Sequence, residues 1–220
     1  MSRLQRPTRP ALRRALVAHC DALAACRACG HGVGVLPIVS RAATPRVMLV
    51  GQAPGSTESA GGKPFAGRAG KTLFRWFERT GIDEDAARRH VYIAAVTRCY
   101  PGRSPSGRGD RVPSLAEQQA CAQWLEAELT IIRPELVIPV GRLAIACFLP
   151  SRPLDELIGR SHDVEIAGRT TEVIPLPHPS GASSWIHQRG HQDLLDRALS
   201  LIGGTLRHLG VARRGGRSVA

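Results

Sequence analysis

Short apolar runs alternate along this chain with segments in which apolar residues recur every three or four positions. The runs Arg46–Val50, Val91–Thr97 and Leu136–Val140 have the length and β-branched composition of buried strands. Less regular runs, Asp163–Ile166 and Thr170–Leu176, predict weaker strands. Strands that alternate with helices indicate an α/β fold with a parallel sheet covered by helices on both faces.

The intervening segments predict helices with one apolar face. Their expected ranges are Ala11–Ala25, Ala69–Thr80, Ser114–Ile132, Gly141–Cys147 and Gln192–Leu209. Ser114 and Glu117 have the spacing of a capping box at the start of the third helix. A Gly-, Ser- and Arg-rich stretch, Gly102–Arg111, predicts a mobile surface loop.

A Gly-rich segment, Gly51–Gly70, separates the first strand from the next helix and contains six glycines and two prolines. Connections of this kind usually take two to six residues, so twenty residues favour a ligand site over a purely structural crossover. The segment is neither a Walker sequence nor a G-x-G-x-x-G fingerprint. Its candidate functional side chains are Gln52, Glu58 and Phe65, each of which alone also fits a solvated or core role.

A histidine, His178, follows a predicted strand directly and stands between Pro177 and Pro179. A lone histidine is more often structural. Here the carboxyl ends of two parallel strands bring His178 and the Gly-rich segment to the same sheet edge, which favours a functional role.

The composition indicates that the protein itself is strongly basic. The 220 residues carry a formal net charge of +12, almost all of it from arginine because Lys63 and Lys71 are the only lysines. This charge predicts a polyanionic partner, nucleic acid ahead of a membrane surface, although the arginine preference of a high-GC genome is an alternative explanation. The expected organisation is a basic arm and helix (1–25), one domain (26–210) and a disordered basic tail (211–220).

No targeting segment or membrane-spanning apolar run is evident, so we expect a cytoplasmic protein with no membrane partner. In that compartment cysteines are more often metal ligands or buried thiols than disulfides. Cys20 and Cys147 fit buried thiols. Four others can enclose a zinc ion or an iron–sulfur cluster, and their spacing does not separate the two: Cys26, Cys29, Cys99 and Cys121.

Three motifs together resemble the iron–sulfur uracil-DNA glycosylases, families 4 and 5. Gly51–Gly55 with Gly62–Gly70 resembles the first motif of that superfamily, and His178-Pro179-Ser180 resembles the second. Tyr92–Cys99 is similar to the strand between them, which ends on a cluster cysteine. The four cysteines named above follow the order of the cluster ligands.

The resemblance implies a three-layer α/β/α sandwich around a central, mainly parallel four-stranded sheet. It implies a monomeric, monofunctional glycosylase of the cytoplasm and nucleoid that flips uracil, or another deaminated base, out of DNA and hydrolyses its N-glycosidic bond. It implies a [4Fe–4S] cluster, with structural zinc as the alternative cofactor.

The same resemblance implies roles for individual residues. His178 and backbone N–H groups would stabilise the departing base, and Phe65 would stack on it. The remaining base-binding positions are Gln52, Ala53 and Ala95. The expected DNA contacts are Arg68, Lys71, Ser180, Gly181, Ser183, Ser184 and Trp185.

The chain departs from both families at the positions where they carry acids or asparagine. Gln52 stands where family 4 has Glu, Ala95 where it has Asn, and Arg68 where family 5 has an acid; the chain has no Asn at all. Ala53 supplies no water-activating acid either. Glu58 is therefore the first choice for activating water, with Gln52 positioning the water or contacting the base.

These departures leave two other functions open. One is a catalytically weak protein that binds damaged or abasic DNA. The other is a cluster-bearing protein that acts on RNA or free nucleosides.

Overall fold

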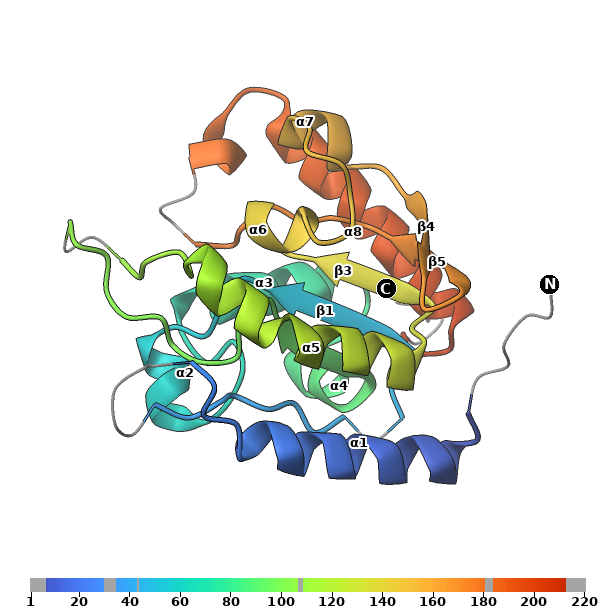
Figure 1. The fold of residues 1–220 in the computed structure, drawn as a ribbon. Helices are drawn as coiled ribbons and strands as arrows, with labels where there is room; N and C mark the ends of the chain where they lie inside the picture. Colours follow the sequence, from blue (N-terminus) through green and yellow to red (C-terminus); the bar gives the residue numbers. More distant parts are fainter. Residues whose placement is uncertain (1–6, 30–34, 43, 107–108, 181–183, 213–220) are drawn as a thin grey trace.

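The computed structural model describes residues 7–29, 35–42, 44–106, 109–180 and 184–212. Its centre is a five-stranded sheet in the order β2-β1-β3-β5-β4 (Figure 1). The strands span Val47–Gly51 (β1), Val91–Ala95 (β2), Leu136–Pro139 (β3), His162–Ile166 (β4) and Arg169–Val173 (β5). The α/β prediction is confirmed, but the sheet has five strands rather than four.

The fifth strand arises from a hairpin at the edge of the sheet. β1 pairs in parallel with β2 and β3, and β3 pairs in parallel with β5. Ala167 and Gly168 both take positive φ angles (49° and 74°), which turn the chain tightly enough for β4 to pair antiparallel with β5. Every residue of β1 and β3 is buried, because helices cover both faces of the sheet.

All five predicted helices are present, with ends shifted by a few residues. Three further helices, α2, α4 and α7, were not predicted. The bounds are Arg9–Ala24 (α1), Ser56–Gly61 (α2), Arg68–Arg79 (α3), Glu84–His90 (α4), Leu115–Ile132 (α5), Arg142–Ile145 (α6), Leu154–Leu157 (α7), Ser184–His187 (the 3₁₀ helix η1) and His191–His208 (α8). Figure 1 shows α5 in front of the sheet and α3 behind it; α1 contacts α5, and α8 contacts α3.

The capping box predicted for α5 is confirmed. The Ser114 hydroxyl accepts a hydrogen bond from the Glu117 N–H (3.3 Å), and Glu117 Oε2 accepts one from the Ser114 N–H (2.7 Å). Two of the otherwise unpaired N–H groups at this helix end are thereby satisfied. The helix ends at Arg133, which takes a left-handed conformation (φ 47°) and is followed by Pro134.

The first helix packs on the domain instead of standing apart from it. Leu12 and Leu16 are buried in the main core and Leu23 is also buried, whereas Ala22 is exposed. Cys20 is buried as predicted. Cys147 is exposed, which corrects its prediction: α6 ends at Ile145, before the cysteine is reached. No helix of the described residues is long and apolar enough to cross a bilayer.

A buried ionic cluster joins α1, α5 and the segment after β2. Glu128 is fully buried and forms an ion pair with Arg98, which is 2% exposed. It also accepts a hydrogen bond from the Tyr92 hydroxyl (2.8 Å) and contacts His19 Nε2 (3.2 Å). Burial by itself raises the pKa of Glu128, but the Arg98 charge and these hydrogen bonds outweigh it, so this pKa lies below the usual value.

Candidate functional site

A pocket of about 440 Å³ lies where the carboxyl ends of β1, β2 and β3 meet the loop after Leu176. This volume suits a small ring-shaped ligand. The pocket brings together residues from three of the sequence motifs. The predicted site residues among its lining are Gln52, Ala53, Glu58, Phe65, Arg68, Ala95, His178 and Ser180.

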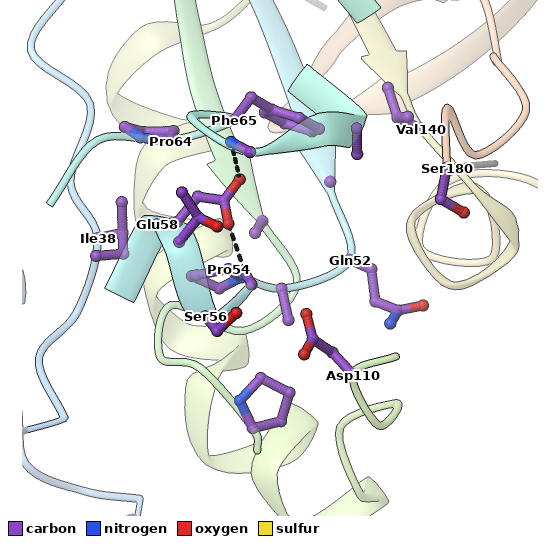
Figure 2. A pocket seen from close by; sticks show the side chains of 18 of the residues that line it. Ile38, Gln52, Pro54, Ser56, Glu58, Pro64, Phe65, Asp110, Val140 and Ser180 are labelled. Carbon is purple, nitrogen blue, oxygen red and sulfur yellow. Dashed lines mark hydrogen bonds between the residues drawn. The ribbon is translucent and has the colours of Figure 1, made fainter. Parts of the chain in front are cut away.

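Phe65 forms one wall of the pocket and has a strained backbone (Figure 2). Its φ of 52° is in the left-handed region, which is unusual for an aromatic residue. Two glycines make the conformation feasible. A Cβ on Gly70 would lie 1.8 Å from the Phe65 carbonyl oxygen, and one on Gly51 would lie 2.9 Å from the Phe65 ring. Both glycines are therefore needed for the ring's placement.

Arg88 on α4 holds this wall from behind, and no sequence motif indicated it. Its guanidinium donates to the carbonyl oxygens of Pro64 (2.8 Å) and Phe65 (3.3 Å). It is fixed in turn by Glu84 (2.8 Å) and lies over the Phe74 ring at 4.5 Å. The guanidinium stabilises the strained turn because it donates hydrogen bonds to both carbonyl oxygens at once.

Glu58 lies beneath the pocket floor and braces the Gly-rich segment. Its side chain is buried, and its two carboxylate oxygens accept hydrogen bonds from the Gly55 and Gly67 N–H groups, both at 3.0 Å (Figure 2). These bonds join the two halves of the segment. Because both oxygens are already occupied by backbone N–H groups and the side chain is buried, the contacts favour bracing over the predicted activation of water.

We expect Glu58→Gln to lower the free energy of unfolding by about 1–3 kcal/mol. The amide has only one oxygen, so its NH₂ group would face a backbone N–H and leave that donor unsatisfied. Urea denaturation of the variant measures the loss. Glu78→Gln, at an exposed position on α3, is the matched control. Equal stability of the two variants would contradict the bracing role.

His178 lines the pocket, and its hydrogen bonds define which ring nitrogen carries the proton. The Ser180 N–H donates to Nδ1 (3.2 Å), so Nδ1 carries no proton. Burial lowers the pKa of His178, which favours the neutral ring, and its single proton therefore resides on Nε2. Gly141 lies against the ring: a Cβ there would come within 3.0 Å of His178 Cδ2.

Two further lining residues were missed in the sequence. Ile38 comes from the connector before β1, and Asp110 comes from the stretch predicted as a mobile surface loop. The described ends of that loop are paired, with backbone hydrogen bonds from Ser104 to Gly109 and from Arg111 to Gly102, both at 3.0 Å. Only the tertiary structure brings this loop to the pocket rim, so no local signal identified either residue.

The predicted DNA contacts are not all at the pocket. Lys71 is exposed on α3, outside the pocket lining. Trp185 is half-buried and stacks on His191 at 4.1 Å. Gly181 and Ser183 lie outside the described residues, and of Ser184 only the backbone, in η1, is described.

The four predicted ligand cysteines come from three segments: the turn after α1, the end of β2 and helix α5. Burial, followed by the neighbouring Cys29, Cys121 and Cys26 thiols, raises the pKa of Cys99 to about 12. The four thiols therefore lie close enough to influence one another. In the described part of the chain, no three metal-ligating side chains converge closely enough to hold an ion, so these positions support neither zinc nor a cluster over the other.

Fold and pocket together define the class: an α/β/α protein with a ring-sized pocket at the carboxyl edge of a parallel sheet, between an aromatic wall and a neutral histidine. The family model of the uracil DNA glycosylase superfamily matches residues 39–200. The chain belongs to this superfamily, which confirms the resemblance stated from its motifs.

Individual relatives agree with this assignment. The chain is 33% identical to the type-4 uracil-DNA glycosylase of Thermotoga maritima over 61% of its own length, and 32% identical to that of Archaeoglobus fulgidus over the same share. In each case the match covers 65% of the relative. The type-5 uracil-DNA glycosylase of Thermus thermophilus is 32% identical over 47% of this chain and 49% of that protein. The chain thus spans just under two thirds of its type-4 relatives.

Proposed function

We propose that this protein is a monofunctional DNA glycosylase that removes uracil and other deaminated bases and leaves an abasic site. The observation that carries the proposal is the pocket lined by both Phe65 and the neutral, Nε2-protonated His178. The names of the type-4 and type-5 relatives supply the substrate.

Breaking an N-glycosidic bond leaves a cationic sugar and an anionic base. An Nε2–H donor toward a base carbonyl stabilises that anion, and a low-dielectric pocket strengthens the hydrogen bond. We propose that the flipped base stacks on Phe65 and that Ala53 and Ala95 leave room for it. Gln52 then contacts the base or the attacking water through its amide.

The charge of the chain supports a DNA partner, since +12 in 220 residues favours binding to phosphates. We propose that Arg68 and Ser180 at the pocket, with Lys71 and Trp185 beyond it, contact the strand. The protein then acts as a monomer on the DNA of the nucleoid in the cytoplasm, through the single domain 26–210.

The test is a base-release panel on single- and double-stranded oligonucleotides that contain uracil, hypoxanthine or xanthine. Alkali-sensitive sites on the uracil substrate are the expected result. Tight binding to uracil or abasic DNA without any base release would instead establish a damage-binding protein, and release from RNA or free nucleosides alone would establish the third function.

We propose a [4Fe–4S] cluster bound by Cys26, Cys29, Cys99 and Cys121. The donor set fits, because four cysteine thiolates are the ligands that hold a [4Fe–4S] cluster, and Cys29, Cys121 and Cys26 are neighbours that, after burial, raise the pKa of Cys99. Arg98 fits as well: its Nε and Nη1 are buried without a partner among the described residues, so two N–H donors are available beside the Cys121 thiol. When bound, the cluster links the N-terminal segment to the sheet and α5.

We expect protein purified under anaerobic conditions to be brown, with a visible thiolate-to-iron absorption band. Cys121→Ser should remove the band and lower the melting temperature while the Cys147→Ser control retains both, because Cys147 is exposed and remote from the other thiols. A colourless protein with one zinc per chain would contradict the iron assignment.

A further inference from the structure

Asp110 places a carboxylate at the pocket rim, on the side where Gln52 lies (Figure 2). Its backbone position is fixed, because the bridge between Arg103 and Asp110 and the hydrogen bond from the Arg111 N–H to the Gly102 carbonyl close the loop around it. The backbone pairing at the base of the loop therefore holds the side chain in place.

The two carboxylate oxygens of Asp110 have different surroundings. Oδ1 accepts a hydrogen bond from the Tyr100 hydroxyl (2.9 Å). Oδ2 lies beside Gly55: a Cβ placed there would come within 3.0 Å of it and within 2.7 Å of Glu58 Oε2, so only glycine fits between the two carboxylates. One oxygen thus orients the group, and the other, which has no hydrogen-bond partner among the described residues, lies beside Gly55 in the pocket lining.

Among the described lining residues, the acidic ones are Glu58 and Asp110. The two carboxylates differ in how accessible they are to a water molecule. Glu58 is buried, with an amide N–H on each oxygen, whereas Asp110 is exposed to solvent. The adjacent Arg111 is engaged by Glu117, at 2.7 and 2.5 Å, and does not neutralise Asp110.

We infer that Asp110 is the general base that accepts a proton from the attacking water. The inference rests on the proposed function and assigns the step that Gln52, an amide, cannot perform because it has no proton-accepting group of sufficient basicity. Gln52 and Asp110 together then hold the water at the sugar face of the pocket.

The step balances as a hydrolysis. The bond between C1′ and the base nitrogen breaks, and its electron pair leaves with the base, whose negative charge His178 Nε2–H stabilises. The water oxygen forms the new bond to C1′. Its proton passes to Asp110 Oδ2 and from there to solvent, which also protonates the released base.

Single-turnover release of uracil from a single-stranded oligonucleotide tests the assignment for wild type, Asp110→Asn and Asp110→Glu. We expect Asp110→Asn to be about 10²–10⁴-fold slower, with Asp110→Glu between the two because it keeps a displaced carboxylate. Affinity is measured on an oligonucleotide that carries 2′-fluoro-2′-deoxyuridine, which resists cleavage, and should not fall. Asp163→Asn, on β4 at the far edge of the sheet, controls for the charge change.

Each outcome decides the assignment. An Asp110→Asn rate within threefold of an active wild type would overturn it while the proposed function stands. A parallel loss of affinity or of folded protein in Asp110→Asn and in a second variant, Asp110→Ser, would assign Asp110 a structural role instead. Wild type that releases no base from any oligonucleotide would overturn the proposed function and this inference together.

Discussion

Replacing His178 with alanine should slow single-turnover uracil release by about 10²–10³-fold, the usual effect of removing one preorganised donor to a developing anion. Ser180 fixes the proton of the neutral ring on Nε2, so the donor is aligned before the base arrives. Affinity for uncleaved DNA should change much less, since the phosphates are bound by basic residues elsewhere.

His208→Ala is the matched control, because His208 is exposed at the end of α8. It should retain the wild-type rate. Circular dichroism and thermal melting of His178→Ala should match wild type, so that a slow rate reports chemistry. A His178→Ala variant within threefold of the wild-type rate would show that the leaving base needs no donor at this position.

Replacing Glu128 with glutamine should lower the free energy of unfolding by about 3–5 kcal/mol, the largest effect on stability that we expect. Glutamine keeps the size of Glu128 but removes the charge that the buried Arg98 requires. Arg98 then remains as an uncompensated cation in the core. Chemical denaturation of the purified protein measures the change.

A double variant separates the ion pair from simple packing. Arg98→Met with Glu128→Leu removes both charges, so it should be less destabilised than Glu128→Gln alone. Asp196→Asn is the surface control: its partner is Arg79, both side chains are about half exposed (47% and 45%), and we expect a loss of about 0–1 kcal/mol. Equal losses for Glu128→Gln and the double variant would contradict a charge-dependent effect.

Local signals explain what was predicted correctly. The apolar runs of β1 and β3 are buried on both faces, and such runs predict central parallel strands whatever surrounds them. Ser114 and Glu117 form their capping box within about one helical turn, so four residues of sequence suffice to predict it. The Gly-rich segment and His178 also follow strand ends, and parallel strands bring such ends to one edge.

Local pattern does not predict features that depend on distant contacts. Glu58 is an acid in a Gly-rich segment and is predicted to activate water; no local signal indicates that its oxygens accept hydrogen bonds from the Gly55 and Gly67 N–H groups. α2 was hidden inside the same segment, because glycines and short length gave it no helical periodicity.

By itself the sequence determined the α/β class and the strand-end location of the pocket, which depend on local periodicity and on the common direction of parallel strands. The superfamily followed from the resemblance of three motifs, two of which supply Phe65 and His178 to the pocket lining. Only the tertiary structure decided the tautomer of His178, the bracing role of Glu58 and the presence of Asp110 and Arg88 around the pocket. These depend on hydrogen bonds and packing between segments far apart in the chain, which no local pattern encodes.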